Sequence, residues 1–400
     1  MFGSATKDRH DRIDWLLLLA LLGLMLLGAA FIYSATMANE STSPLPWYTQ
    51  TYLKQIIWYV VGLTGAIAIT FVDYRILSRW SYVFFWVAIG LLVTVLIFGK
   101  TVNGARRWFS LGFFQFQPSE FAKLAFIFAL GSFLSRPADE LRFPHIFWKA
   151  VGMIALPFVL IMKEPDLGSA LVLLPTGTAM LFVAGTPRRF LMRLGGTLGI
   201  LAALFLVDIL FAPPGWWQIK LEEYQRHRLL VYFGADFAPM DATPAQMRQA
   251  EELQRQKSYQ VRQALISVGS GGWLGKGWRQ GQQTLGFLPR GAAHNDFIFS
   301  VIAKEEGFVG SVMVLTLYSV ILFFGIRIAS QARDRLGKLL AVGVVTLFFS
   351  HVFINIGMNI RIMPVTGVPL PLLSYGGSSV LCSLIAIGLL QNVHTHRKSY

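Results

Sequence analysis

The stretch IDWLLLLALLGLMLLGAAFIYSAT, residues 13–36, carries a single charged side chain, Asp14, in an otherwise largely apolar run. About 20 apolar residues in a helix cross the ~30 Å hydrocarbon core of a bilayer, so this run predicts a transmembrane helix. Similar runs lie at 52–71, 80–99, 191–212, 308–326, 339–358 and 372–392, and shorter or more broken ones at 119–134, 146–162 and 167–184. The sequence therefore predicts an all-α integral membrane protein, a single polytopic domain over residues 1–400 with about ten transmembrane helices.

The composition agrees with a membrane protein. Hydrophobic residues make up 54% of the chain, charged residues make up 14%, and the mean hydropathy is +0.54. This balance is unlike that of a soluble domain. Lys7, Arg9 and Arg12 precede the first run as they would in a secretory signal peptide, but the run is longer than the ~7–15 apolar residues of such a peptide. We therefore interpret it as an uncleaved signal anchor.

Lys and Arg residues gather in alternate connecting segments, and none lies between residues 35 and 51. The positive-inside rule assigns the basic segments to the cytoplasm, which predicts that both termini are cytoplasmic. Much of the net charge of +14 is thereby explained as topology, and a nucleic-acid-binding function is unnecessary to account for it. The residues concerned are Arg75, Arg79, Arg136, Arg142, Lys149, Arg188, Arg189, Arg193, Arg327, Arg333, Arg335, Lys338, Arg397 and Lys398.

Residues 213–295 form a polar segment far longer than an ordinary connection, which indicates a functional loop. The topology places this loop outside the cytoplasm. It holds ten Lys and Arg residues against six Asp and Glu. Its stretch from about 244 to 265 has helical character and follows Trp216 and Trp217, as in an interfacial helix that lies on the membrane. A basic surface of this kind suits a polyanionic lipid head such as a pyrophosphate, although an ordinary solvated loop remains an alternative.

Several common chemistries lack their residues. The only cysteine, Cys382, lies in an apolar run, so we expect no disulfide framework and no zinc cluster. The tract VGSGGWLGKGW at 268–278 resembles a phosphate loop, but Ser270 and Gly277 occupy positions where that motif needs Gly and Ser or Thr. The histidines show no metalloprotease spacing, and we expect no metal site. Without a nucleotide site, any reaction must use a substrate that is already activated.

One carboxylate stands out as a catalytic candidate. In HNDFIFSVIAKEEGFVG, residues 294–310, Asp296 lies where the long polar loop runs into an apolar helix. An ionisable group at a membrane surface costs free energy to hold there, and such groups commonly serve function. We predict that Asp296 is the catalytic residue.

Three other segments carry polar groups near the same face. In QPSEFAKL, residues 117–124, Glu120 and Lys123 are spaced i, i+3 and share a helix face, where they either contact substrate or pin two helices together. In KEPDLGSA, residues 163–170, Asp166 stands at a helix start, where a carboxylate also has a purely structural role.

The third segment is PVTGVPLPLLSYGGSS, residues 364–379, which has three prolines and three glycines and includes Ser374. This composition predicts a broken helix near the outer face. Irregular backbone at membrane depth persists only when it is buried in protein or lines a cavity. Together these features predict a site on the outer face of the membrane.

These segments also resemble the signature blocks of the SEDS family, the shape, elongation, division and sporulation proteins. The blocks are GARRWFSLGFFQFQPSEFAKL (104–124), EPDLGSA (164–170), the glycine tract, HNDFIFSVIAKEEGFVG (294–310) and NIGMNIRIMPVTGVPLPLLSYGGSS (355–379). The resemblance runs from about residue 12 to the C-terminus, and the ending QNVHTHRK is more similar to the elongation (RodA) branch than to the division branch. Within the family pattern Asp296 aligns with the essential aspartate.

The resemblance implies a ten-span peptidoglycan glycosyltransferase of the bacterial cytoplasmic membrane that polymerises lipid II on the outer face during cell elongation. It implies a class B penicillin-binding protein as partner. It names no certain cofactor and leaves open whether a divalent cation such as Mg²⁺ assists the pyrophosphate. The chain departs from the pattern at Glu164 (usually Gln), at Lys304 (usually a carboxylate), and at Asn359 and Arg361 (usually small or apolar).

Chemistry and resemblance together predict a mechanism. Lipid II brings its own leaving group, so the enzyme must supply a base for the attacking 4-hydroxyl and cations for the departing pyrophosphate. Asp296 suits the first task, and Arg228, Lys123 and Arg106 are candidates for the second. Attack opposite the leaving group inverts the anomeric carbon and gives a β-linkage. The alternatives are a lipid II flippase, which needs a site reachable from both faces, and a non-enzymatic scaffold, which leaves Asp296 without a task.

Overall fold

The computed structural model describes residues 14–37, 50–102, 105–110, 115–211, 223–234, 244–280 and 293–397. The basic residues at positions 7, 9, 12 and 398 and parts of the predicted long loop lie outside these ranges. The main helices are α2 (Trp15–Met37), α3 (Thr51–Phe71), α5 (Ser81–Phe98), α6 (Pro118–Leu134), α7 (Pro144–Lys163), α8 (Leu167–Val183), α9 (Arg188–Phe211), α10 (Glu223–Phe233), α11 (Pro244–Ser270), α13 (Ile298–Glu305), α14 (Gly307–Gln331), α15 (Arg335–Asn359) and α16 (Gly377–His396).

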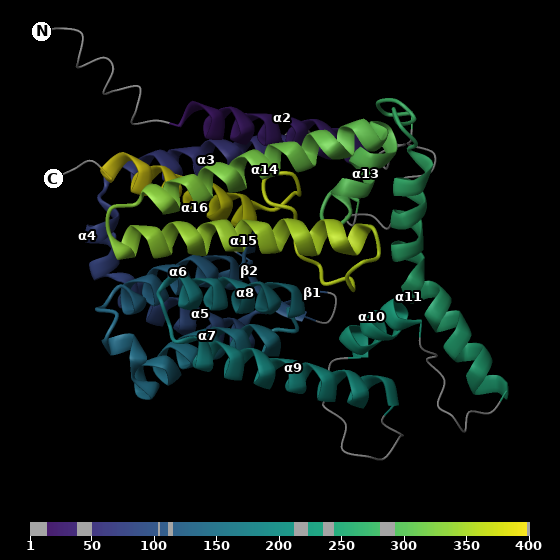
Figure 1. The fold of residues 1–400 in the computed structure, drawn as a ribbon. Coiled ribbons are helices and arrows are strands. Elements are labelled where there is room, and N and C mark those ends of the chain that lie inside the picture. Colours follow the sequence, from purple (N-terminus) through teal and green to yellow (C-terminus); the bar gives the residue numbers. More distant parts are fainter. Residues whose placement is uncertain are drawn as a thin grey trace, which may run out of the picture.

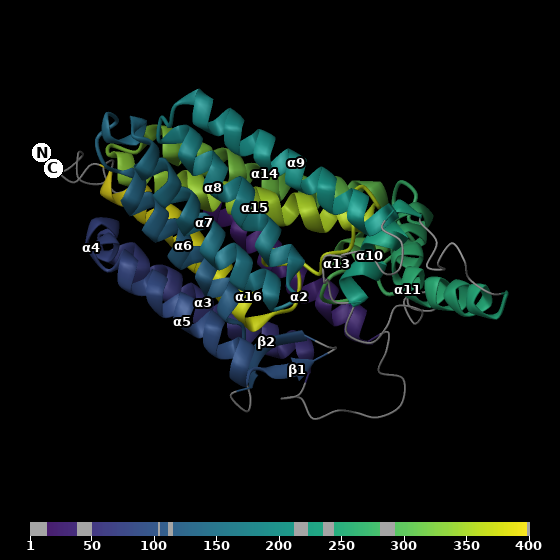
Figure 2. The same cartoon turned by 90° about the horizontal axis from the view of Figure 1, so that it is seen from below.

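The long helices lie side by side as a bundle (Figures 1 and 2). α15 runs through its interior and packs against α14, α8, α6 and α16, while α16 pairs along its length with α3. α9 lies at the edge beside α8 and buries few of its side chains. α2 begins and α16 ends at one end of the bundle, and α10 and α11 lie at the other (Figure 1).

In the described part of the chain, eight helices are long and apolar enough to cross a membrane: α2, α3, α5, α7, α9, α14, α15 and α16. The two further predicted spans correspond to α6 and α8, which have 17 residues each and fall short of that length. The all-α membrane fold is therefore confirmed, and the count of ten spans stays a prediction. The last span was expected from residue 372, but its helix begins at Gly377.

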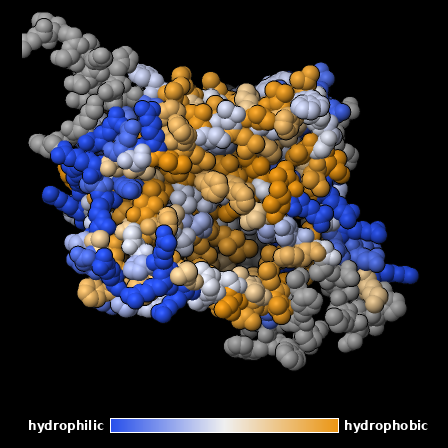
Figure 3. All heavy atoms as spheres, viewed as in Figure 1, coloured by the Kyte–Doolittle hydropathy of each residue, from blue (hydrophilic) through white to orange (hydrophobic). Residues whose placement is uncertain are grey.

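The surface has the distribution of a protein that lies in a bilayer. Figure 3 shows an apolar band across the middle of the molecule, with hydrophilic surface towards both ends. Exposed aromatic and aliphatic side chains on the long apolar helices include Trp86, Ile200, Leu204 and Phe323. Exposed apolar side chains in this number are unfavourable in water and favourable against lipid.

A small antiparallel sheet, which the sequence analysis did not anticipate, connects α5 to α6. Its strands β1 (Lys100–Val102), β2 (Ala105–Ser110) and β3 (Gln115–Phe116) lie in the order β1-β2-β3, with Lys100 opposite Trp108 and Phe109 opposite Phe116. Alternate side chains of a strand point to opposite faces. The sheet therefore presents Arg106 and Arg107 in different directions.

The irregular segment predicted at 364–379 lies between α15 and α16, at residues 360–376. Its first part is exposed at Arg361 and Ile362, and most of residues 365–374 are buried in protein. Tyr59 of α3 and Tyr318 of α14 donate hydrogen bonds from their hydroxyls to the carbonyls of Leu372 and Pro371. Gln55 of α3 donates to the Ser374 carbonyl (3.2 Å) and accepts from the Gly376 amide (3.3 Å). These partners satisfy backbone groups that lipid would leave unpaired.

The glycine tract after α11 packs backbone to backbone against the junction of α13 and α14. A Cβ atom on Gly271 would lie 1.9 Å from the Ala303 carbonyl oxygen, and one on Gly275 would lie 2.0 Å from the Glu305 carbonyl oxygen. Gly307, between the two helices, has φ +65°, which is strained for other residues. Only glycine permits this approach, so the tract serves to hold α13 in place.

Candidate active site

Asp296 lies one residue before Phe297, the N-cap of α13, at the end of the bundle where α10 and α11 lie. Its backbone carbonyl accepts hydrogen bonds from the side-chain amides of Asn355 (3.1 Å) and Asn359 (3.2 Å), which stand four residues apart on α15. Asn355 also donates to the Val368 carbonyl (2.7 Å). Two amides on one helix face thus fix the backbone of Asp296 relative to the irregular segment, and the residue as a whole is partly buried.

Arg228 of α10 brings a cation to this carboxylate. Its Nη1 donates to the Val365 carbonyl (3.3 Å). A Cβ atom on Gly367 would lie 3.4 Å from Arg228 Nη1 and 3.6 Å from Asp296 Oδ2. The guanidinium and the carboxylate therefore lie against the same point of the irregular segment, and a larger residue than glycine would crowd both.

Asp166 and Arg107 form the neighbouring part of the site. As predicted, Asp166 begins α8, where its Oδ1 accepts from the Ser169 amide (3.1 Å). Its Oδ2 accepts from Gln117 Nε2 (3.2 Å), and its Oδ1 lies 3.8 Å from Arg107 Nη1. Arg107 also donates from Nε to the Glu164 carbonyl (3.1 Å) and from Nη2 to the Pro165 carbonyl. Asp166 therefore caps a helix and positions a cation at once.

The electrostatic balance at Asp296 favours a base. Burial raises the pKa of Asp296 above its ordinary value, the nearby charges of Arg228 and Arg107 lower it, and the charge of Asp166 raises it. The net direction is upward. A carboxylate with a raised pKa binds a proton more strongly, and it is a better general base than an exposed one.

Glu164 adds a buried carboxyl beside these groups. It follows α7, is fully buried, and neither of its side-chain oxygens has a hydrogen-bond partner among the described residues. Burial, together with the charge of Asp166, raises the pKa of Glu164 to about 9, against the lowering effect of Arg107. At neutral pH this carboxyl is protonated, so it adds no negative charge near Asp296.

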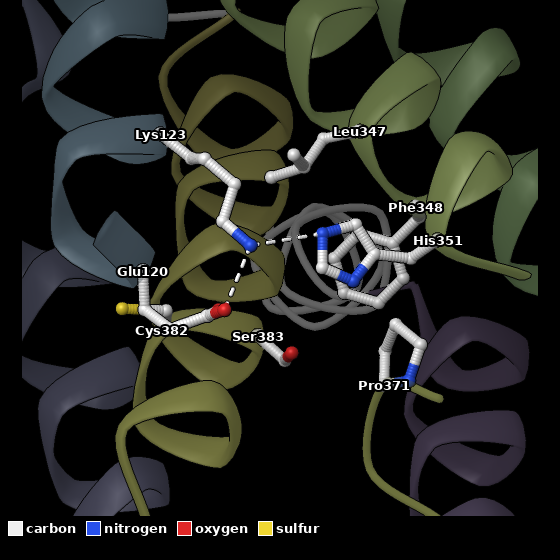
Figure 4. Close-up of a pocket in the computed structure, with 8 residues that line it drawn as sticks. All are labelled: Glu120, Lys123, Leu347, Phe348, His351, Pro371, Cys382 and Ser383. Carbon is white, nitrogen blue, oxygen red and sulfur yellow. Dashed lines mark hydrogen bonds and ion pairs between the residues drawn. The ribbon is translucent and has the colours of Figure 1, made fainter. Parts of the chain in front are cut away.

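Glu120 and Lys123 of α6 are buried, and Lys123 points towards both Glu120 and His351 (Figure 4). Lys123 Nζ lies 2.8 Å from Glu120 Oε1 and 3.0 Å from Nε2 of His351 on α15. His351 Nδ1 lies 3.4 Å from the Pro369 carbonyl of the irregular segment. The cavity beside these residues, also lined by Cys382 and Ser383, has a volume of about 20 Å³. That is room for about one water molecule and not for a sugar.

The remaining two predicted residues occupy different positions. Ser374 is buried, and its hydroxyl donates to the Asn295 carbonyl (2.6 Å) and accepts from the Leu370 amide (2.8 Å). We therefore assign Ser374 to positioning the Asp296 loop. Arg106 is exposed on β2, and it is Arg107 that reaches Asp166.

The structure thus brings Asp296, Arg228 and Asp166 to one place and adds three residues that sequence reasoning missed: Arg107, Asn355 and Gln117. The sequence could have indicated Asn355, because a polar amide within an apolar span usually has a structural or functional role. Among the described residues, no group of three or more His, Cys, Asp or Glu side chains is arranged to hold a metal ion.

Comparisons with known proteins cover nearly the whole chain. A family model described as "Cell cycle protein" and named for FtsW, RodA and SpoVE matches residues 14–399. MrdB of Escherichia coli (strain K12), named a peptidoglycan glycosyltransferase, is 33% identical over 389 residues, which cover 96% of this chain and 94% of MrdB. RodA of Treponema pallidum (strain Nichols), also named a peptidoglycan glycosyltransferase, is 33% identical and covers 96% and 98% of the two chains. Stage V sporulation protein E of Bacillus subtilis (strain 168) is 35% identical with the same coverage.

Solved structures show the same fold. One similar chain belongs to a peptidoglycan synthase complex described for its coordination of polymerization and crosslinking. It has a TM-score of 0.72 and 29% identity and covers 97% of this chain and 99% of that one. RodA of Thermus thermophilus has a TM-score of 0.66 and 28% identity, with coverage of 97% and 98%. The chain described here belongs to the FtsW/RodA/SpoVE family.

Proposed function

We propose that this protein is a peptidoglycan glycosyltransferase that polymerises lipid II at the outer face of the bacterial cytoplasmic membrane, with Asp296 as the general base. The names of its relatives support the activity. The observation that carries the assignment of Asp296 is its position: its carboxyl group has a raised pKa and lies beside Arg228, and its backbone carbonyl is held by two amides of α15.

The chemistry divides between a base and two cations. The Asp296 carboxylate takes the proton of the acceptor's 4-hydroxyl as that oxygen attacks the donor's anomeric carbon. The bond between this carbon and the pyrophosphate oxygen breaks, and the electron pair leaves with the pyrophosphate. Arg228 and Arg107 stabilise the charge that develops there, because a guanidinium binds phosphate oxygens in pairs. Attack from the opposite side inverts the anomeric carbon.

The deeper pair supports this site from within. Lys123 links Glu120 on α6 to His351 on α15, and His351 faces the Pro369 carbonyl. In the sequence analysis the pair was a candidate for substrate contact or for pinning helices. The small cavity favours a positioning role in which the pair holds the irregular segment that lies against Asp296.

The orientation and partner follow from the same proposal. We place both termini in the cytoplasm and α10 and α11 outside, where lipid-linked precursors are polymerised. We propose a class B penicillin-binding protein as partner, supported by the similar chain from a complex that couples polymerization to crosslinking. A lipid II flippase is the alternative, and it differs in that it forms no polymer.

The test is Asp296→Asn in the purified protein with its partner and lipid II. We expect loss of polymer by at least about 10²-fold, since general-base catalysis contributes roughly that factor, with unchanged thermal stability in detergent. The matched control is Asp139→Asn, an exposed aspartate in the turn before α7 at the opposite end of the bundle. Polymer formation by Asp296→Asn at the rate of the control would remove Asp296 from catalysis.

The pH profile supplies a second measurement. Because Asp296 acts as its carboxylate, activity rises as pH rises through its pKa, and burial displaces that pKa upward from an ordinary aspartate. Replacing Arg228 with Gln removes a charge that lowers the pKa of Asp296, so the rising limb shifts to higher pH.

A further inference from the structure

A second cavity lies beside the candidate active site, outside the bundle. It lies between α10, α11 and the turn that follows α15, and its volume is about 420 Å³. Cavities of roughly 300–1,000 Å³ hold small ligands. The mechanism above makes no use of this space.

The described lining includes three arginines: Arg255 and Arg262 from α11 and Arg361 from the turn that follows α15. Arg255 and Arg262 stand seven residues apart and therefore share one face of the helix. Among the described lining residues Glu251 is the one acid, so these residues carry a net positive charge. Among the described residues, none of the three arginines forms a salt bridge. A guanidinium offers paired donors that match carboxylate and phosphate oxygens.

The backbone at Arg361 is itself unusual. Its φ is +61°, in the left-handed region that is costly for residues other than glycine. Arg361 follows the C-cap of α15, and its amide donates to the Met358 carbonyl (3.3 Å), as in the left-handed turn that commonly ends a helix. The turn that holds this conformation is fixed by amides of Ile362 and Met363, which donate to the Gly357 carbonyl at 2.8 and 3.1 Å.

The cavity and the candidate active site share a wall. Val261, which lines the cavity, packs against a buried cluster that includes Phe297 and Val365. Phe297 follows Asp296, and the Val365 carbonyl accepts the hydrogen bond from Arg228. One turn after Arg228, the same helix contributes Val231 to the cavity. The cavity and the candidate active site therefore adjoin the same apolar cluster.

We propose that this cavity is an oxyanion subsite of the polymerase, in which Arg255, Arg262 and Arg361 bind an anionic group of the lipid-linked substrate. The inference rests on the proposed function. Two parts of that substrate carry the required chemistry, the carboxylates of its peptide stem and its diphosphate, and both are oxyanions that arginine binds in the same geometry.

The test compares two substrates and two variants. The substrates are lipid II with its full peptide stem and a lipid-linked disaccharide diphosphate without the stem. The variants are the double change Arg255→Gln with Arg262→Gln and the single change Arg361→Gln. The matched control is Arg248→Gln, which removes an exposed arginine from α11 outside the cavity lining. Polymerization gives KM and kcat, and thermal unfolding in detergent reports folding.

We expect the double variant to raise KM by about tenfold or more, because that is the effect of losing a charge-assisted hydrogen bond. Its kcat and thermal stability should be close to those of the control. A rise confined to the stem-bearing substrate assigns the carboxylates as the ligand, and a rise on both substrates assigns the diphosphate. An unchanged KM on both substrates overturns the proposal.

Two further measurements distinguish a failure of this proposal from an unfolded variant and from a failure of the proposed function. If Arg361→Gln unfolds because of its turn, Arg255→Lys with Arg262→Lys provides the second test, since it keeps the charge and loses the paired donors. We expect an intermediate KM for it, and a KM equal to that of wild type contradicts recognition by paired donors. Failure of the wild-type protein to form polymer would instead refute the proposed function.

Discussion

At the scale of single residues, the candidate site depends on the backbone of Asp296 as much as on its carboxylate. Asn355 and Asn359 donate to its carbonyl, and Ser374 donates to the carbonyl of the preceding residue. These three residues come from segments about 60 to 80 positions away along the chain. Each of these hydrogen bonds restricts the backbone conformation of the loop and so helps to hold Asp296 in one orientation.

Sequence reasoning selected Asp296 and Asp166 as carboxylates beside apolar segments, and Arg228 as one of the basic residues of the long loop. It chose Arg106 over Arg107, since nothing in the sequence says which of two adjacent arginines faces the site. That choice follows from the pleat of β2 and its pairing with β1, which depend on the sheet that forms around residues 100–116. These pairs are local in sequence, but the register of such short strands is not evident from the residue types alone.

Glu164 gives a prediction about pH and stability. Its carboxyl is protonated in the folded protein up to about pH 9 and ionised in the unfolded chain above about pH 4.5. The unfolded state therefore binds fewer protons in this window. Stability falls as pH rises, by up to about 1.4 kcal/mol for each pH unit.

We expect Glu164→Gln to remove this dependence, because the amide does not ionise. The variant should unfold at higher temperature than wild type at pH 8.5, and the difference should nearly vanish at pH 5. Thermal unfolding in detergent at several pH values measures it. A difference between the two proteins that stays constant with pH would mean that Glu164 is ionised in the folded state.

At the scale of elements, the helices were predictable and their junctions were not. Apolar runs of sufficient length give the long helices, and Asp166 and Pro118 mark the starts of α8 and α6 as expected. The span predicted at 308–326 corresponds to α14, and the apolar helix predicted after Asp296 corresponds to the short α13; what the sequence did not indicate is how the two helices meet at Gly307. The break depends on contact with the glycine tract about 30 residues earlier.

That contact provides the second prediction, Gly271→Ala. The new methyl group meets the Ala303 carbonyl oxygen, which is backbone and has no rotamer to change. We expect a loss of about 1–3 kcal/mol of stability, typical of overpacking, and lower activity because α13 carries Asp296 at its start. Gly269→Ala is the matched control, since a Cβ atom there meets nothing within 4 Å. Equal unfolding temperatures for the two variants would contradict the docking role of the tract.

At the scale of the whole molecule, charge and topology agree. The connecting segments that hold the basic residues meet at one end of the bundle. Arg335 donates to the carbonyls of Arg136 (2.6 Å) and Ala184 (3.1 Å), and Arg75 lies 3.3 Å from Asp334. The candidate active site and the cavity of arginines lie at the other end, with α10 and α11 (Figure 1). The connecting segments that the sequence assigns to one side of the membrane therefore lie together at one end of the folded bundle.

The orientation of this bundle in the membrane is the last prediction. The rule that basic segments stay in the cytoplasm places Ser330, near the end of α14, inside and Glu252 of α11 outside. Both side chains are exposed. In a background of Cys382→Ser, which removes the only natural cysteine, Glu252→Cys should react with a membrane-impermeant thiol reagent in intact cells, and Ser330→Cys should react only after the membrane is opened. Labelling of Ser330→Cys alone in intact cells would invert the topology and place Asp296 on the side where no lipid-linked precursor is polymerised.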